Sequence, residues 1–352
     1  MRLRQFYSIG IGFSLLLGAF MLTPGHVWAQ DTGTTRTVKK TGTTAATFLT
    51  IPVGARATAM GNAITASVQD GTALYWNPAG LAGIHDLSLT AEHATWLAGI
   101  QFNYAALTLP GAGGTFAFGV TALRTPDMDV TTVFEQEGTG ETFNAASYAF
   151  ALSYGRFLTD RFALGVSVKM ITERIWHSTA TGMALDIGTV FTTPFKGIRL
   201  GASITNFGTK MRIRGEDLLV RKDIAPNMHG NNESVTAMLT TEPFDMPLTM
   251  RIGVAGELVR TPRTRITWAV DALHPNDNAE YVNLGMEVGL LGDMVMFRVG
   301  YNELFLQDSA RSYTAGAGLH YRLGVMDFVL DYAFEPNRYF APVHRVTMQV
   351  KL

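Results

Sequence analysis

Residues 344–352, at the end of the chain, alternate strictly between apolar and polar side chains. Side chains repeat with period two along a β-strand, so this segment forms a strand with one apolar and one polar face. A soluble domain rarely finishes on such a strand, whereas the closing strand of a membrane β-barrel turns its apolar face to lipid and its polar face to the lumen. The segment therefore predicts a transmembrane barrel, although Leu352 stands where an aromatic residue is more common. The apolar face consists of Val346, Met348, Val350 and Leu352.

The other end of the chain has the three parts of a secretory signal peptide. Arg2 and Arg4 form a basic region, residues 9–22 are apolar, and residues 27–29 end in a small residue suited to cleavage. The apolar run is too short for a membrane-spanning helix, which needs about 20 residues. We expect residues 1–29 to be removed on export, and the absence of cysteine excludes a lipoprotein anchor.

The composition agrees with a barrel. The 352 residues include 36 glycines and no cysteine, only 16% are charged, and the mean hydropathy is +0.13. Such a chain, weakly hydrophobic throughout, suits strands whose lipid-facing and lumen-facing residues alternate. Loss of Arg2 and Arg4 lowers the 28 basic residues to 26 against 29 acidic ones, and this small negative charge argues against nucleic acid as a partner.

From residue 86 onward the pattern predicts about fourteen strands of roughly ten residues, the length that a tilted membrane strand needs. In the fifth of them, for example, Phe162, Leu164 and Val166 oppose Ala163 and Gly165. The expected ranges are 86–95, 99–109, 113–124, 143–156, 161–174, 180–193, 197–206, 247–260, 263–273, 280–290, 293–302, 311–323, 325–334 and 341–351.

Short and long connections alternate along the chain. The connection after the second strand and every other one thereafter is a tight turn, whereas those between are mostly longer, with short exceptions at 95–98 and 175–179. Short periplasmic turns and long external loops are typical of outer-membrane barrels, and an even strand number leaves both chain ends in the periplasm. We therefore predict an all-β fold, a transmembrane antiparallel β-barrel of about 14 strands with a short N-terminal helical plug.

The residues before the first strand have a different character. Residues 30–47 are rich in Thr and Gly and predict a flexible periplasmic leader. Within residues 48–85, apolar residues at helical spacing predict a helix over Ala55–Val68, followed by a turn at residues 77–80. We expect residues 48–85 to plug the mouth of a barrel formed by residues 86–352.

Several charged side chains lie on the strand faces expected to line the lumen. A charge on the lipid face costs about 2–4 kcal/mol at the membrane midplane, which favours the inward assignment. Because both signs occur, the lumen can be filled with water or with ion pairs and the plug. The set is Lys169, Arg251, Glu257, Arg265, Asp271, Glu287, Arg298, Arg322, Asp327, Asp331 and Arg345.

The stretch Phe48–Ala63, together with Asp70 and the turn Asn77-Pro78-Ala79-Gly80-Leu81-Ala82, resembles the N-terminal region of the PorV/PorQ family. That family falls within the fourteen-stranded barrels typified by the long-chain fatty-acid transporter FadL, which carry an N-terminal hatch with an Asn-Pro-Ala-Gly turn. Gly54 stands where family members often have Asp, which removes a possible partner of Arg56. The resemblance implies a plug motif of Pro52, Gly54, Arg56, Met60, Gly61, Asn77, Pro78 and Gly80.

By this resemblance, we expect a non-enzymatic component of type IX-like protein export in the bacterial outer membrane, which contacts lipid and binds a translocon or secreted cargo. The alternative is a FadL-like transporter of hydrophobic small molecules, which would need an apolar pocket continuous through the lumen. The inward charges weaken this alternative without excluding it. A purely structural barrel is a third, minor possibility.

Residues Gly208–Met246 form the strongest candidate for a binding surface. This connection is about forty residues long, and loops of such length are usually functional or disordered. Its mixture of basic and apolar residues fits a docking surface for a partner or a lid, while a solvated loop is equally compatible. We expect it to be extracellular and to bind a partner through Arg212, Arg214, Leu218, Leu219 and Arg221.

Arg56 has two interpretations, a contact with a ligand carboxylate or an ion pair with acids of the lumen. We favour the second, because a buried arginine seeks bidentate carboxylates. Residues 77–80 are likewise interpreted as a turn rather than as part of a permeation route.

No motif indicates catalysis, a metal or a cofactor. The 8 histidines show no metal-ligand spacing. Residues 165–169 lack the second glycine of a nucleophile elbow, and the glycines of 111–114 precede a strand rather than the helix that a phosphate-binding loop needs.

Overall fold

A computed structural model describes residues 41–111, 113–228 and 234–352. The chain divides into residues 1–38 and 39–352, and the description below concerns the second unit alone. The expected signal peptide, residues 1–29, and most of the expected leader therefore lie outside the described residues.

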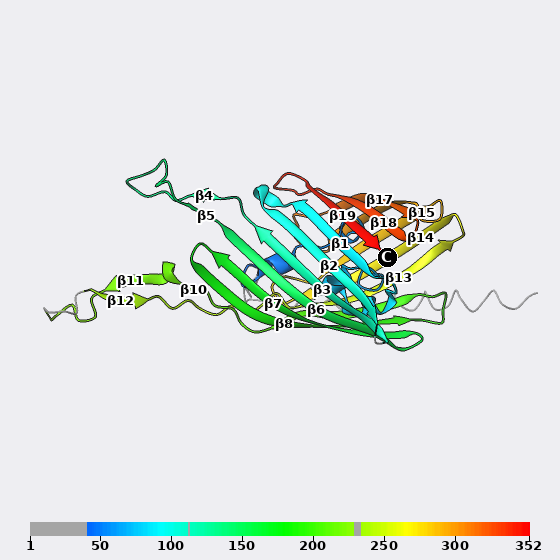
Figure 1. Cartoon of the computed structure of the whole chain (residues 1–352), viewed down its shortest axis with the longest axis horizontal. Coiled ribbons are helices and arrows are strands. Elements are labelled where there is room, and N and C mark those ends of the chain that lie inside the picture. The colour runs from blue at the N-terminus through cyan, green and yellow to red at the C-terminus, as the bar shows by residue number, and fades with distance from the viewer. Residues whose placement is uncertain (1–40, 112, 229–233) are drawn as a thin grey trace, which may run out of the picture. The chain divides into compact units, whose positions relative to one another are not determined.

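Fourteen strands, each hydrogen-bonded to two antiparallel neighbours, close into a barrel (Figure 1). The strands follow one another in sequence order around the wall, and the first pairs with the last, which closes the ring. The predicted all-β barrel is confirmed. The strands are β1 (Ser88–Thr95), β2 (Gln101–Gly111), β3 (Gly114–Arg124), β6 (Ala145–Thr159), β7 (Phe162–Ile175), β8 (Ser178–Thr192), β9 (Arg199–Gly208), β13 (Thr249–Arg260), β14 (Thr264–Pro275), β15 (Tyr281–Leu290), β16 (Val295–Leu304), β17 (Tyr313–Leu323), β18 (Met326–Glu335) and β19 (Val343–Lys351).

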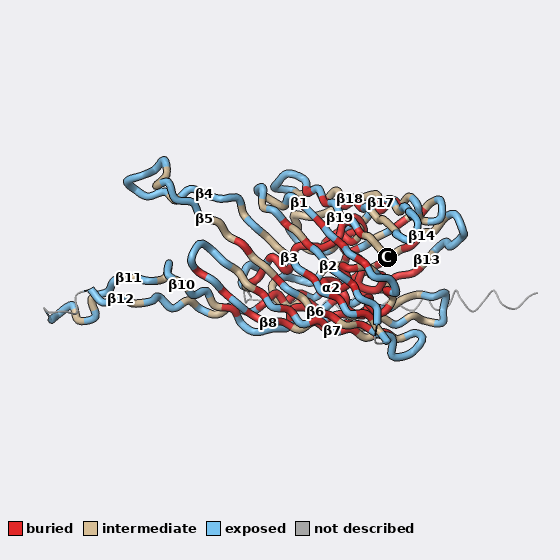
Figure 2. Tube along the Cα trace, viewed as in Figure 1, coloured by how far each residue is buried: buried red, intermediate tan, exposed pale blue. Residues whose placement is uncertain are grey.

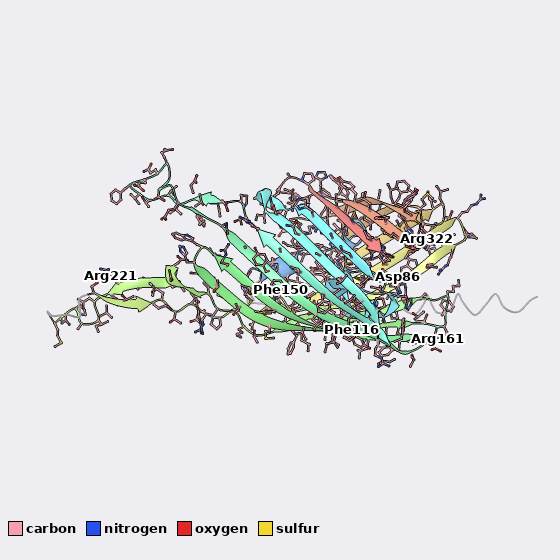
Figure 3. All side chains as sticks on the ribbon, in the orientation of Figure 1. Asp86, Phe116, Phe150, Arg161, Arg221 and Arg322 are labelled. Atoms are coloured by element: carbon pink, nitrogen blue, oxygen red, sulfur yellow. The ribbon has the colours of Figure 1, made fainter. Side chains whose placement is uncertain are left out.

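The wall places apolar side chains outside and polar side chains inside. In β19, Val346 and Met348 are 45% and 48% exposed, whereas Arg345 and Thr347, which alternate with them, are 0% and 6% exposed. Figure 3 shows Phe116 and Phe150 on the wall between charged residues that lie toward its two ends. This arrangement is the reverse of a soluble barrel and is that of a barrel surrounded by lipid.

The two ends of the barrel differ in their connections. At one end, the short-turn end, strands join through tight turns such as the ones after β2, β6 and β17. At the other, the long-loop end, two hairpins project beyond the wall (Figures 1 and 2). They are β4 (Met128–Asp129) with β5 (Thr142–Phe143), and β11 (Leu219–Lys222) with β12 (Val235–Met238). The short β10 (Arg214–Gly215), η4 (Glu216–Leu218) and η3 (Leu97–Gly99) also belong to this end.

The residues before β1 form what we call the N-terminal segment, residues 44–84, and it packs against the inner side of the wall. It contains η1 (Thr47–Thr50), α1 (Ala55–Ala59), α2 (Ala73–Trp76) and η2 (Pro78–Gly83). Helix α1 contacts β16 to β19, and η2 contacts β3 and β6 to β8, so the segment reaches opposite sides of the barrel. No helix of the described residues is long and apolar enough to cross a bilayer.

The predicted helix over Ala55–Val68 is wrong. Helix α1 ends at Ala59, because Gly61 and Asn62 take φ angles of +62° and +60°, which end a right-handed helix. A side chain at Gly61 would collide with the backbone of β15 and β16, so this turn presses directly on the wall. The apolar residues whose spacing suggested a long helix instead lie on an irregular chain with several short turns.

The last residues of the expected flexible leader are held in place. The N–H of Ala46, a residue that is 1% exposed, donates to Glu173 at the end of β7 at 3.0 Å, and the N–H of Ala45 donates to the carbonyl of Asp245 at 2.9 Å. Both acceptors lie at the long-loop end. The N-terminal segment therefore enters the barrel at the long-loop end and leaves it at the short-turn end, where β1 begins.

Candidate functional site

Glycines on the inner face of the wall let the backbone of the N-terminal segment touch the strands. A side chain at Gly165 of β7 would collide with the backbone of Pro78 and Ala79, and one at Gly300 of β16 would collide with Gly61. The wall is therefore shaped to receive the segment, which explains part of the high glycine content.

The turn at Asn77 is a buried anchor rather than an exposed loop. The Asn77 amide donates to the carbonyls of Thr65 and Thr189 at 2.8 and 3.1 Å, and its oxygen accepts the N–H of Ala79 at 3.1 Å. A side chain at Gly188 would occupy the space of the Asn77 amide. The turn interpretation holds for these residues, and the side chain of Asn77 also ties two parts of the segment to β8.

Arg56 forms the ion pair expected from its sequence context. Its Nε lies 3.0 Å from Oε2 of Glu287, and its Nη1 lies 3.7 Å from Asp70. Burial alone would lower the pKa of Arg56, but Glu287 and Asp70 outweigh it and raise that pKa, so the guanidinium stays charged.

Glu287, which has no exposed surface, is shared by three arginines. Besides Arg56, it lies 2.7 Å from Nε of Arg298 and 2.9 Å from Nη1 of Arg265. Arg298 also reaches Asp331 at 2.6 Å. Charges from β14, β15, β16 and β18 thus meet the segment in one network. Removing one member would leave buried charges without partners, which is costly.

A second group of contacts surrounds Glu92 of β1. Its carboxylate accepts the N–H of Gly54 and a hydrogen bond from Arg345, and both Glu92 and Arg345 are fully buried. Thr347 accepts the N–H of Ala55 at 2.8 Å. Gly54 has a φ angle of +95°, a conformation that an aspartate rarely adopts. The acid at this position is instead supplied by Glu92 of the wall.

Two further acids lie on the inner face of the wall. Asp271 of β14 accepts the N–H groups of Ile64 and Thr65 at 2.9 and 2.8 Å, and Asp186 of β8 pairs with Lys169 at 2.6 Å. The sequence interpretation missed Glu92 and Asp186. The signal was present, because each occupies a polar position of its strand's period-two pattern.

The inward assignment of charges holds for most of the expected set. Three of its members lie at the short-turn rim instead of in the interior. The Arg322 side chain is 72% exposed and pairs with Asp327, and Glu257 pairs with the exposed Arg260. The buried members are Lys169, Arg251, Asp271, Glu287, Arg298, Asp331 and Arg345, and Arg265 is half-buried.

The remaining residues of the expected plug motif are also buried. Met60, which packs with Ala63 and Ala66 of the segment, is 0% exposed. The carbonyl of Val53 accepts the indole N–H of Trp76 at 2.7 Å, which links the stretch around Pro52 to α2. A side chain at Gly80 would collide with Val68, so only glycine allows this close contact within the segment.

Two small cavities lie between the N-terminal segment and the wall. One cavity of about 20 Å³ lies between Leu74 and the wall at Gly119 and Ala151, and another of about 30 Å³ lies beside Arg251. On the outer face, an apolar hollow of about 540 Å³ is also lined by Gly119 and Ala151. Gly119 and Ala151 therefore line a hollow on each face of the wall. Among the described residues no cluster of acidic or histidine side chains could hold a metal.

The expected binding loop begins with a part that docks on the barrel and continues into the projecting hairpin. Arg214 pairs in register with Thr179 of β8, and Arg212 lies half-buried next to the buried Met211. Leu219 and Arg221 lie on β11 and are exposed, and Leu218 is half-buried. Figure 3 shows Arg221 far out on this hairpin, at the opposite end from Arg161 and Arg322.

Solved structures with a similar fold are fourteen-stranded barrels of the FadL-like type. The Pseudomonas putida toluene transporter TodX matches with a TM-score of 0.54 and 13% identity over 85% of this chain and 97% of that one. The Ralstonia pickettii toluene transporter TbuX matches with a TM-score of 0.52 and 11% identity over 85% and 97% of the two chains. The CymD monoaromatic hydrocarbon channel matches with a TM-score of 0.51 and 12% identity over 86% and 97%.

These identities are low, so the likeness establishes the fold. None of these matches points to the PorV/PorQ family in particular. A comparison with curated protein sequences gives no match. A family model does match residues 23–223, more than half of the chain. The chain therefore belongs to the uncharacterised protein family UPF0164.

Proposed function

We propose that this protein is a non-enzymatic outer-membrane barrel that carries hydrophobic small molecules across the membrane. The observation that carries the proposal is the fold shared with two toluene transporters and a monoaromatic hydrocarbon channel, along 97% of the length of each. The export role suggested by the PorV/PorQ resemblance has no comparable support from these matches.

The filled lumen favours a selective route over an open pore. A barrel of fourteen strands needs its interior filled if it is not to conduct, and the N-terminal segment supplies this filling as a plug. The two interior cavities of about 20 and 30 Å³ are each too small to hold a molecule of the size of toluene. Transport through the lumen therefore requires part of the segment to shift.

The wall at Gly119 and Ala151 supports a hydrophobic substrate. The outer hollow there is lined by apolar side chains of β1 to β3, β6 and β7, including Leu89, Phe118 and Met170. The inner cavity behind it is bordered by Leu74 and Tyr104 of the segment and wall. Mostly apolar surfaces thus lie on both faces of the wall at these two residues, and Lys169 also borders the inner cavity.

Uptake of radiolabelled toluene by cells that produce the barrel tests the proposal. Cells with the wild-type protein should accumulate toluene several-fold faster than cells with an empty vector. Gly119→Leu should reduce the rate toward that of the vector, because its side chain would push against Leu74 and fill the inner cavity. Ala317→Leu, which enlarges a side chain of β17 away from both hollows, should leave uptake unchanged. Equal uptake by wild-type and vector cells would refute the transport role.

A second candidate, docking of a secreted or translocon protein, is favoured by the two projecting hairpins. Phe134 and Val133 between β4 and β5 are 96% and 84% exposed, and Met238 and Leu219 on the other hairpin are 57% and 47% exposed. Such exposed apolar side chains suit a partner surface. Replacing residues 220–237 by a tight turn should abolish surface display of cargo and leave toluene uptake intact if this role holds. Loss of uptake with intact display would instead assign the loop to transport.

A further inference from the structure

Arg251 is a buried cation without an acidic partner. It lies on the inner face of β13 near the long-loop end and is 5% exposed. Its Nη1 donates to Oγ1 of Thr205 at 2.8 Å, while its Nε has no hydrogen-bond partner. Within the described part of the chain, no Asp or Glu forms an ion pair with it.

The other buried arginines of the lumen differ in this respect. Arg298 pairs with two acids, and Arg345 pairs with Glu92. Asp271, on the strand next to Arg251, directs one carboxylate oxygen to backbone N–H groups of the segment; it attracts Arg251 from a distance but forms no ion pair with it. A buried charge without a contacting partner costs folding free energy unless a counter-ion binds beside it.

Arg251 borders the cavity of about 30 Å³ near the long-loop end. Its guanidinium carbon lies 5.4 Å from the ring centre of Trp76 and 5.8 Å from that of Tyr75, so the two rings of α2 cover one side of it. Thr50, which is exposed, also lines the cavity and marks its side toward the long-loop end. A water needs only about 10–15 Å³ of such volume, so a small ion has room here.

The other arginine at the cavity, Arg311, is paired with acids. Arg311 and Glu303 both line it, but Arg311 lies 3.8 Å from Glu303 and 3.4 Å from Glu335 and is thereby compensated. Burial raises the pKa of Tyr75 to about 12, so its hydroxyl stays neutral at physiological pH. Arg251 is therefore the cation at this cavity whose charge a bound anion could neutralise.

We propose that this cavity binds a small monovalent anion on Arg251, either a free ion or the carboxylate head of an organic acid whose remainder points past Thr50 toward the long-loop end. The planar fork of a guanidinium suits a carboxylate, and the rings of Trp76 and Tyr75 exclude water around the pair. The site goes beyond the proposed uptake of hydrophobic molecules and does not depend on it, because binding can be measured on the purified barrel.

Quenching of tryptophan fluorescence by iodide tests this site. The purified protein in detergent, in a buffer without halide, should show a saturable quenching component that Trp76→Phe removes. Formate should compete with iodide at the site, and toluene should not. Neutral acrylamide should quench without saturation, which separates anion binding from simple access to the ring.

Arg251→Met should abolish the saturable component, and Arg251→Lys should retain it with weaker affinity because it keeps the charge. Arg338→Met is the matched control, since Arg338 also lies over a ring, that of Tyr339 at 5.6 Å, but on the exposed surface. Heat-modifiable migration in SDS gels verifies that each variant is folded. If Arg251→Met does not fold, the affinity of Arg251→Lys for iodide tests the site.

Competition by both formate and benzoate would assign the head of an organic acid, and competition by formate alone would assign a free ion. Quenching that never saturates, or that saturates equally in Arg251→Met, would refute the site. Neither result bears on toluene uptake, so failure here is distinct from failure of the transport proposal.

Discussion

At the scale of single residues, the interior of this barrel depends on acids that each serve several partners. Glu287 is the clearest case, because arginines from the segment and from two wall strands converge on its carboxylate. A buried carboxylate in this position holds the segment and the wall together at once. The charge network is therefore a structural device, and it accounts for the presence of so many charges inside a membrane barrel.

Glu287→Gln should destabilise the folded barrel by about 3–5 kcal/mol, the usual cost of removing one partner from a buried ion pair. Loss of the folded band in SDS gels across a urea series measures this. Asp327→Asn is the control, because Asp327 pairs with Arg322, whose side chain is 72% exposed, and such pairs contribute about 0–1 kcal/mol. Equal effects of the two substitutions would contradict the role of Glu287.

The sequence predicted which side chains point inward, but it predicted only a few of the contacts between them. Strand periodicity placed Arg298 and Asp331 on the inner face, because the face on which a strand residue lies follows from the local alternation of apolar and polar residues. Their pairing with each other and with Glu287 follows from the order of strands around the wall and the path of the segment, which no local pattern encodes. The unpaired state of Arg251 could be recognised only once every nearby acid was located.

At the scale of elements, the strands follow their local pattern and the N-terminal segment does not. The alternation and turn signals fix each strand because its two faces meet different surroundings along its whole length. The segment is buried on all sides, so its apolar spacing gives no preference for one helix over several short turns. Gly61 and Asn62 decide the outcome by ending α1 against the wall.

The hairpin of β11 and β12 is attached to the barrel through Asp217 of η4. Its carboxylate accepts a hydrogen bond from Ser178 Oγ at 2.8 Å and from the His177 N–H at 3.1 Å. Burial alone would raise the pKa of Asp217, but these hydrogen bonds outweigh it and lower the pKa from the usual 3.8. Because the pKa is lowered on docking, the attachment is present above about pH 4 and is lost as the pH falls below that value.

A nitroxide on Leu219→Cys measures this attachment without background, because the chain has no other cysteine. The label should keep a constant mobility from pH 8 to pH 5 and become more mobile below about pH 4. Asp217→Ala should make it mobile throughout this range. A label that is mobile at every pH in the wild-type background would show that Asp217 does not anchor the hairpin.

At the scale of the whole molecule, the wall is closed and the N-terminal segment lies inside it. The sequence predicted the wall, the number of strands and the presence of residues inside it. It did not predict that the N-terminal segment is anchored at the long-loop end, because the contacts of Ala45 and Ala46 involve residues more than one hundred positions away.

Deletion of residues 48–84 should convert the protein into an open pore in planar lipid bilayers, because the segment occupies the lumen. The wild-type protein should show no steady conductance under the same conditions. Replacing residues 220–237 by a tight turn is the control, and it should remain closed because the hairpin lies outside the lumen and the Asp245 carbonyl that holds Ala45 is kept. A deletion variant that folds and remains closed would show that something else blocks the lumen.

The central claim, that movement of the N-terminal segment carries hydrophobic molecules through the barrel, is tested most directly by tethering the segment to the wall. Ala55→Cys with Thr347→Cys places a sulfur where Thr347 Oγ1 lies 2.8 Å from the N–H of residue 55. Ser153→Cys with Ser167→Cys is the control, because these hydroxyls lie 2.6 Å apart within the wall. Toluene uptake should cease when the first pair is oxidised, return on reduction, and be unaffected by the second pair. Uptake at the wild-type rate through the oxidised tether would contradict the claim.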